Sequence, residues 1–360
     1  MAPPLSAVDA ISPAFGQTKR QLFQPFRLGH WLRLAVVGLL TGEFAGGWSG
    51  SGNFSPPSQT TGEDDWGLAF LGLADPTPEK VLAFLPWILA AVVLLLTLGL
   101  IAIYIASVFR FILFDTVLTG RCRLREGWRR WREAGSRFFL WQVGFGLAVL
   151  AALGVVVGAP LYFAWRAGLL EKADANAGLL ILGGVVLFFL VIGLVLFALV
   201  VDLFARDFLV PVMALESLGA LAAWRRLLPL LGAEKMSYAG FVLMKIVLAI
   251  GSAILFGIVD VIVLLVLLIP LGIVAFVVVV AAASAGLTWN LYTIAVAVLV
   301  GLVGLLFLFY IVLFVYVPGL VFFQSYALRF FGGRYPLLGS MLERFSPPAP
   351  GSAPTPAPAA

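Results

Sequence analysis

The chain has 360 residues, of which 62% are hydrophobic and only 11% are charged; its formal net charge is +5, and it has one cysteine and one histidine. An average soluble domain carries about a quarter of its residues as charges, so this composition excludes an ordinary soluble globular protein. Cys122 cannot form an internal disulfide, and with His30 alone it cannot supply a usual zinc or haem ligand set. The sequence therefore predicts no cofactor.

The first half of the chain contains one short apolar segment and three long ones. Residues 31–47 are short for a membrane crossing and include two charged residues, Arg33 and Glu43. The three longer, uncharged segments are residues 81–109, 138–165 and 175–201. Each of these exceeds the ~20 residues that a tilted helix needs to cross a bilayer, so all three are predicted to cross.

The second half contains a run of 68 residues without a charge, residues 261–328. As one helix this run would be ~100 Å long against a hydrocarbon layer of ~30 Å, so it must fold back on itself. Pro270 with Gly272 predicts one break, because proline removes a backbone donor and clashes with the preceding turn. Residues 286–290 predict another. The candidate helices are residues 239–267, 271–287 and 291–321, and the middle one is short enough to be re-entrant.

The predicted fold class is therefore all-α: a polytopic transmembrane helix bundle of about six crossings, with seven as the alternative. The distribution of charge favours six. Twenty of the 23 Lys and Arg residues fall at Lys245 or in four segments, residues 1–33, 110–137, 202–238 and 329–360. Residues 43–80 carry six acidic residues and one basic residue. The positive-inside rule then predicts an inner-membrane protein with both termini cytoplasmic, which requires residues 31–47 to cross.

A weak internal repeat accompanies this pattern. An amphipathic stretch precedes each pair of crossings, at residues 13–29, 124–137 and 212–231. In the second stretch, Leu124, Trp128 and Trp131 fall on one helical stripe and arginines take the other positions. The predicted unit is an interfacial helix plus a membrane hairpin, repeated at about 11–109, 121–205 and 212–330 within a single transmembrane domain, residues 1–345. Residues 346–360 are Pro/Ala-rich and are predicted to be a disordered tail.

The amphipathic stretches supply the candidate contact residues. Tryptophan rings prefer the headgroup level, and a basic residue beside anionic lipid gains ~1 kcal/mol. The candidates for contact with lipid headgroups or a protein partner are Trp128, Arg129, Arg130, Trp131, Trp224, Arg225 and Arg226. The alternative is that these residues only anchor the bundle. No base-stacking platform or groove-reading motif accompanies them, so nucleic acid is not predicted as a partner.

A few charged residues lie near the predicted crossings. Glu43 is a candidate intramembrane polar residue: it lies either at the outer interface or buried, where it would assist proton or substrate movement. Lys245 is predicted to extend to the inner surface. Arg206 and Asp207 are predicted to form a local ion pair where a crossing meets the cytoplasm.

The sequence contains no Walker loop, HExxH, GxSxG or paired cysteines, so the chain is predicted not to be an enzyme. Two functions remain open. The first is a non-catalytic multi-pass membrane protein that organises lipid or a membrane protein partner through its basic amphipathic helices. The second is a transporter or permease component with a polar cavity between hairpins. The sequence identifies no small-molecule substrate.

Three segments carry a resemblance to known proteins. They are residues 15–34 (FGQTKRQLFQPFRLGHWLRL), residues 207–213 (DFLVPVM) with Ala223 and Trp224, and residues 318–328 (PGLVFFQSYAL). They resemble stretches of uncharacterised bacterial polytopic membrane proteins, and the hairpin-repeat organisation is similar to the membrane domain attached to some glycerophosphodiester phosphodiesterases. The resemblance implies a multi-pass inner-membrane protein of unknown role. The phosphodiesterase catalytic domain is absent, so no hydrolase activity is implied.

Overall fold

The computed structural model describes residues 4–43, 78–169, 176–284, 286 and 290–345, and these ranges fold into helices without a β-strand. The long helices follow from runs of apolar residues whose backbone groups find no water in lipid and must bond within the helix. The helices are α1 (Ile11–Phe23), α2 (Leu28–Thr41), α5 (Pro78–Thr119), α6 (Leu124–Arg166), α7 (Ala177–Phe204), the π-helix η1 (Ala205–Leu209), α8 (Val210–Glu216), α9 (Ala220–Ala233), α10 (Lys235–Ser284), α11 (Leu291–Gly332) and α12 (Pro336–Phe345).

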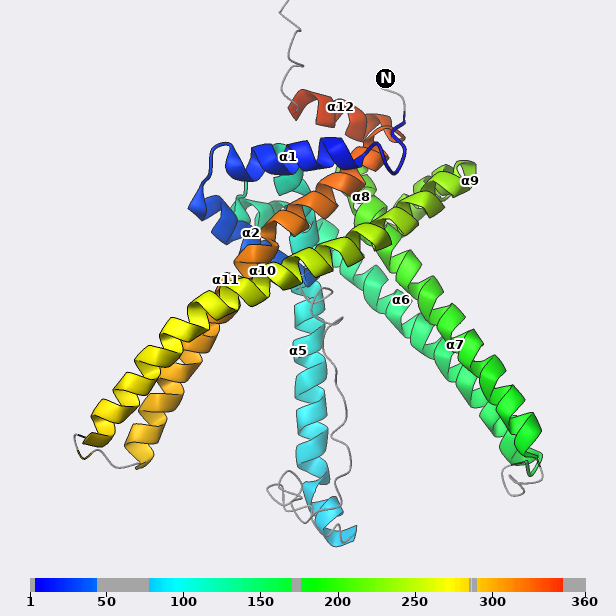
Figure 1. Ribbon diagram of the computed structural model, residues 1–360. Helices are drawn as coiled ribbons and strands as arrows, with labels where there is room; N and C mark the ends of the chain where they lie inside the picture. Colours follow the sequence, from blue (N-terminus) through cyan, green and yellow to red (C-terminus); the bar gives the residue numbers. More distant parts are fainter. Residues whose placement is uncertain (1–3, 44–77, 170–175, 285, 287–289, 346–360) are drawn as a thin grey trace, which may run out of the picture.

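Figure 1 shows these helices arranged as a head on three legs. The head contains α1, α2, α8, α9 and α12, together with the ends of the long helices that meet there. One leg is α5 alone, the second pairs α6 with α7, and the third pairs α10 with α11. Helices α1 and α12 from the two ends of the chain both lie at the side of the head away from the legs.

The buried core lies in the head. Aromatic rings from three distant segments meet there: Phe241 of α10 lies 5.1 Å from Phe208 of η1 and 4.6 Å from Phe330 of α11, between ring centroids. Trp31 of α2 stacks on Phe314 of α11 at 4.7 Å. Each aromatic side chain removes a large apolar area from solvent, so these contacts hold the ends of separate legs in one packed unit.

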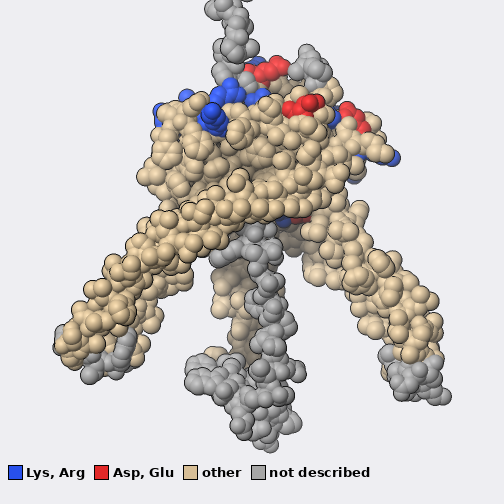
Figure 2. Space-filling model, viewed as in Figure 1, with Lys and Arg blue, Asp and Glu red and all other residues tan. Residues whose placement is uncertain are grey.

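The legs, by contrast, are not covered by the rest of the chain. The accessible surface of the molecule is 24096 Å², whereas a compact soluble protein of this mass exposes ~14,000 Å². In Figure 2 the charged side chains gather on the head, and the described leg surfaces in view carry none. Five helices are long and apolar enough to cross a membrane: Phe84–Thr119, Leu124–Arg166, Ala177–Glu216, Lys235–Ala281 and Tyr292–Gly332. The protein is therefore a membrane protein.

Glycine allows a close helix crossing in the head, between α5 and α6. A Cβ atom added at Gly135 of α6 would lie 2.6 Å from Val108 Cγ2 and 2.8 Å from Val108 Cα of α5. At Gly127 it would lie 3.1 Å from Ile112. The two backbones approach this closely because neither glycine has a side chain, and this contact fixes the direction in which the second leg departs from the first.

The break predicted at Pro270 is wrong. Helix α10 continues through this residue, as α5, α6 and α11 continue through Pro86, Pro160 and Pro318. In hydrocarbon no water can satisfy the backbone groups that a helix end would expose, so a helix tolerates an internal proline there better than it tolerates ending. The second predicted break is confirmed, since α10 ends at Ser284 and α11 begins at Leu291.

The crossing count and the repeat are not confirmed. Helix α2, which overlaps the first predicted crossing (residues 31–47), is 14 residues long and packs in the head against α5 and α11. The second amphipathic stretch, residues 124–137, is the first part of α6 and not a separate helix. The third, residues 212–231, is interrupted at Ser217, whose φ of 55° ends α8 before α9 begins. The predicted tail, residues 346–360, lies outside the described residues.

Candidate functional site

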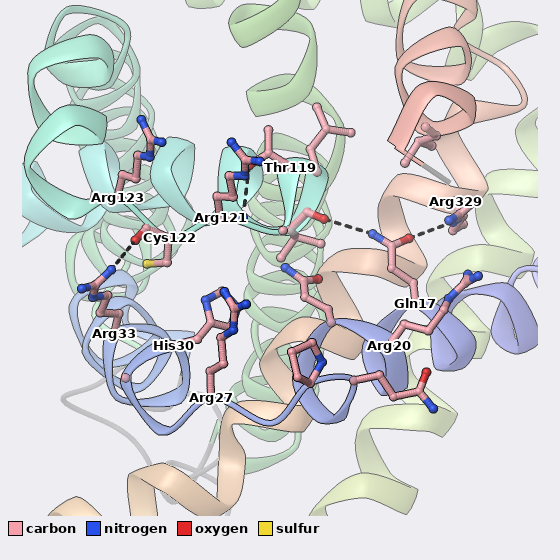
Figure 3. Close-up of a pocket in the computed structure, with 18 residues that line it drawn as sticks. Gln17, Arg20, Arg27, His30, Arg33, Thr119, Arg121, Cys122, Arg123 and Arg329 are labelled. Carbon is pink, nitrogen blue, oxygen red and sulfur yellow. Dashed lines mark hydrogen bonds between the residues drawn. The ribbon is translucent and has the colours of Figure 1, made fainter. Parts of the chain in front are cut away.

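A pocket of about 880 Å³ opens in the head between α1, the start of α2 and the turn that joins α5 to α6 (Figure 3). His30 lines it, and none of its described lining residues is Asp or Glu. Its cationic lining comes from α1, the α1–α2 connection, α2, the α5–α6 turn and α11. The six lining arginines are Arg20, Arg27, Arg33, Arg121, Arg123 and Arg329. We refer to this site as the arginine pocket.

Two glutamine side chains assemble the pocket. The α5–α6 turn begins at Gly120, whose φ of +71° is a left-handed conformation that favours glycine. Helix α1 is fixed across this end of α5 because Gln17 Nε2 donates to Val117 O at 3.0 Å and Gln21 Nε2 donates to Thr116 O at 2.9 Å. These carbonyls belong to the last turn of α5, where main-chain acceptors run short of helical partners; Thr116 O also accepts from Gly120 N at 2.8 Å. The same bonds that cap α5 therefore bring the arginines of α1 beside those of the turn.

Hydrogen bonds hold some of the arginines in place. Arg33 Nη1 donates to Cys122 O at 3.1 Å, and Arg329 Nε donates to Gln17 Oε1 at 2.9 Å (Figure 3). A guanidinium carries five N–H donors, so the bond to Cys122 orients Arg33 and leaves most of its donors for a ligand.

Burial and positive charge shift the pKa values of two groups that line the pocket. The pKa of His30 is lowered from its ordinary value, first by burial and then by repulsion from Arg33 and Arg27. At neutral pH the imidazole is therefore uncharged. Burial raises the pKa of the Cys122 thiol, against the smaller opposing influences of Thr116 and Arg33. Burial is the larger cause of both shifts; the nearby arginines add to the shift of the His30 pKa, and Arg33 opposes the shift of the Cys122 pKa.

A second polar site lies where the legs leave the head. It contains six charged residues, three acidic and three basic, from α5, the α7–η1 segment, α10 and the end of α2. These residues, which we call the junction cluster, are Glu43, Arg110, Asp202, Arg206, Asp207 and Lys245. Lys245 Nζ of α10 lies 2.5 Å from Asp207 Oδ2 of η1, and the Asp207 side chain is only 6% exposed. The cluster thus joins all three legs and is neutral in sum.

Glu43, the predicted intramembrane residue, belongs to this cluster. Its Oε1 lies 3.8 Å from Arg110 Nη1 and 4.0 Å from Arg206 Nη1, and its side chain is 37% exposed. Arg110 is buried and also donates to Thr41 O at 3.4 Å. Glu43 is therefore at the edge of a charge network, and it does not line either of the two pockets described in the head.

The predicted Arg206–Asp207 ion pair is wrong. Arg206 pairs with Asp202, one turn earlier, and Asp207 pairs with Lys245. Consecutive residues point to different faces of a helix, whereas residues four apart share a face, so Arg206 reaches Asp202. Lys245, predicted to extend to the inner surface, instead turns to Asp207 inside the cluster.

The predicted contact tryptophans pack on other aromatic rings in the head. Trp131 is buried and stacks on Phe111 with ring centroids 5.8 Å apart, and Trp128 lies 5.8 Å from Phe109. Trp224 lies 5.7 Å from Trp141 of α6. Packing within the head accounts for most of this aromatic stripe.

The predicted contact arginines lie at the surface. Arg129 and Arg225 are exposed. Arg130 lies 4.8 Å from the centroid of the Trp131 ring, and Arg226 Nε lies 3.5 Å from Glu216 Oε1. Their contact with lipid or a partner stays a prediction.

One comparison with known proteins identifies a family. A model described as a family of unknown function (DUF7544) matches residues 5–341. The chain belongs to this family. No curated protein and no solved structure matches the chain. The DUF7544 match covers the head and all three legs, and it carries no link to the membrane domain of glycerophosphodiester phosphodiesterases, so that resemblance stays a prediction.

Sequence reasoning missed both the arginine pocket and the junction cluster. The pocket combines residues 17–33, 117–123 and Arg329, which are separated by up to 312 positions along the chain. The available signal was only the count of basic residues in these segments. In the described part of the chain, no group of three or more His, Cys, Asp or Glu side chains is arranged to hold a metal ion.

Proposed function

We propose that this protein is a non-catalytic membrane protein that organises anionic lipid at the cytoplasmic face of an inner membrane. The observation that supports this proposal is the separation of charge in Figure 2: the Lys and Arg side chains in view lie on the head, and the described leg surfaces in view are apolar. With the legs in hydrocarbon, the first turns of α6 come to the level of the lipid headgroups. Arg125 and Arg129 are exposed there, and each basic residue near an anionic surface gains ~1 kcal/mol.

The lipid shell of the purified protein tests the proposal. We expect membrane discs extracted directly from cells to contain more anionic lipid around the wild-type protein than the bulk membrane contains. The Arg125→Gln/Arg129→Gln variant should lose much of this enrichment, because it removes two exposed charges. Arg166→Gln, at the far end of the same helix, is the control and should keep it. Equal lipid composition in all three preparations and the bulk membrane would refute the proposal.

The proposed orientation is tested separately. A reporter enzyme that is active only in the cytoplasm, fused after Ala360, should be active in cells. A periplasm-specific reporter at the same position should be inactive. The opposite pair of results would place the head on the other side of the membrane and contradict the cytoplasmic assignment.

A transporter or permease component is the second candidate function, and the junction cluster is the observation that favours it. Ionisable groups at membrane depth are expensive and often mark ion or proton pathways. If the cluster moves protons, vesicles containing the protein should dissipate an imposed pH gradient faster than empty vesicles, and Glu43→Gln should slow them. A wild-type rate equal to that of empty vesicles would exclude this candidate.

A further inference from the structure

We propose that the arginine pocket is a binding site for a ligand carrying more than one phosphate group. This inference goes beyond lipid contact by the exposed arginines of α6, because it concerns a separate site on α1, α2 and the α5–α6 turn. The test of this site does not depend on whether the exposed arginines of α6 contact lipid.

The charge of the pocket is the first argument. Six arginines line one space of about 880 Å³, and no described lining residue is a carboxylate; one of the six, Arg123, pairs at 2.8 Å with Glu126, which lies outside the lining. Like charges that line one space repel one another, to an extent that solvent screening reduces at the exposed arginines. The repulsion that His30 experiences from Arg27 and Arg33 shows the same effect at one group. A bound anion would offset this repulsion.

The type of cation selects the type of anion. All the permanently charged residues that line the pocket are arginines. The planar guanidinium presents paired N–H donors that match the oxygens of a phosphate group, whereas a lysine offers only a compact point charge. Arg33 is already oriented by its bond to Cys122 O, so part of the entropy of ordering that side chain is lost before a ligand arrives.

Four of the six arginines form two groups. Arg27 and Arg33 act electrostatically on His30, and Arg20 acts on Arg329. Figure 3 draws Arg33, His30 and Arg27 on one side of the pocket and Arg20 and Arg329 on the other. The volume lies in the range of small-molecule sites, roughly 300–1,000 Å³, and is much larger than one phosphate ion requires. Two cationic groups in a pocket of this size fit a ligand with two phosphates better than a single ion.

Polar atoms without partners provide an independent argument. His30 Nε2 and Gln21 Oε1 are both buried, and neither has a hydrogen-bond partner among the described residues. Both residues line the pocket. Buried polar groups in proteins are nearly always hydrogen-bonded, and an unsatisfied one loses roughly 1–3 kcal/mol. Both atoms are covered by protein, so a phosphorylated ligand with hydroxyl or protonated phosphate oxygens would become their partner after the side chains rotate towards the pocket.

The test uses the full chain in discs of zwitterionic phosphatidylcholine, titrated with pyrophosphate in a calorimeter. We expect saturable binding, weaker binding of inorganic phosphate, and little binding of succinate, which carries two carboxylates. Arg27→Gln/Arg33→Gln should weaken pyrophosphate binding at least about tenfold, the loss expected for removed charge-assisted hydrogen bonds. The matched control, Arg125→Gln/Arg129→Gln, removes the same charge from the exposed face of α6 and should change the affinity less than about twofold, because neither residue lines the pocket.

The source of the phosphate is distinguished by adding phosphatidate, a lipid with a phosphomonoester headgroup, to the discs. If the ligand is a lipid headgroup, phosphatidate will compete and lower the apparent affinity for pyrophosphate. If the ligand is a soluble phosphate compound, the affinity will not change. Either result supports a phosphate site. Arg27→Gln alone, at an exposed position, repeats the measurement in case the double variant does not fold.

Three outcomes would overturn the inference. They are the absence of pyrophosphate binding, succinate binding as tight as that of pyrophosphate, and equal affinity in the Arg27→Gln and wild-type proteins. None of them bears on the enrichment of anionic lipid around the exposed arginines of α6, so failure of this site is distinguishable from failure of the proposed function.

Discussion

At the scale of single residues, arginine occupies two chemically different environments in the head. In the junction cluster, Arg110 and Arg206 lie near carboxylates, and the sum of charges is zero. In the arginine pocket, Arg27 and Arg33 face a space without a lining carboxylate and act on His30 instead. The first environment stabilises the folded chain internally, and the second leaves positive charge available to an external anion.

The pKa of His30 depends in part on the positive charge of the arginine pocket. Its pKa lies below the ordinary value of 6.5, partly because of Arg33, so Arg33→Gln should raise the pKa of the imidazole. Since His30 is the only histidine, its ring signals can be followed by NMR during a pH titration without ambiguity. Arg129→Gln, far from the pocket lining, should leave the titration unchanged. An unaltered His30 pKa in the Arg33 variant would contradict the pocket geometry.

The same depressed pKa predicts a loss of stability in acid. Above about pH 6.5 the imidazole is neutral in both the folded and the unfolded chain; as the pH falls through that value, the unfolded chain takes up the proton first. Stability should therefore fall as the pH decreases from 7 towards the lowered folded pKa. His30→Gln removes this contribution, and its unfolding midpoint should depend less on pH in this window.

Cys122 offers a further check at this scale. The thiolate is the reactive form, and burial raises the pKa of this thiol while covering its sulfur. The native protein should therefore react slowly with a maleimide at neutral pH and rapidly after denaturation. Fast labelling of the native protein would show that the α5–α6 turn is more open than described.

At the scale of helices, sequence reasoning located the apolar segments but not their ends or partners. Residues 81–109 and 138–165 fall within α5 and α6, and residues 177–201 of the third segment fall within α7, because a run of apolar residues must satisfy its backbone groups internally in lipid. The expected break at Pro270 failed for the same physical reason. The aromatic stripe of residues 124–137 was recognised as amphipathic, but periodicity alone cannot tell whether an apolar face meets lipid or another helix; here Trp131 meets Phe111.

The α5–α6 crossing gives the prediction at this scale. Gly135→Ala places a methyl group against the backbone of Val108, so it should destabilise the protein by about 1–3 kcal/mol, as overpacking does. Gly144→Ala in the same helix has open space around it and should be neutral or stabilising by up to ~1 kcal/mol, because alanine favours helix more than glycine. Thermal unfolding of the two variants in detergent compares them; equal midpoints would contradict the close crossing.

At the scale of the whole molecule, the junction cluster and the aromatic core hold three otherwise separate legs together. No single segment of the sequence contains either feature, since the cluster combines the end of α2 with α5, the α7–η1 segment and α10. The fold class and membrane embedding followed from composition. The two candidate sites did not, because they depend on which distant helices meet in the head.

Removing one partner of the buried Lys245–Asp207 pair should weaken this junction. Lys245→Met leaves the Asp207 carboxylate buried without its cation and should cost about 3–5 kcal/mol, while Lys245→Met with Asp207→Leu should recover much of the loss. A double-mutant cycle on unfolding free energies measures the coupling. If the single and double variants are equally stable, the pair does not contribute to holding the legs.

The separation of the legs has a consequence for the surrounding bilayer. Helices in a closed bundle share one outer boundary, whereas here each leg presents its own circumference to acyl chains. The annulus of lipids in direct contact with the protein is therefore the sum of three perimeters and includes molecules enclosed between the legs. Spin-labelled lipids should accordingly report more motionally restricted molecules per protein than a compact bundle with the same number of helices would hold.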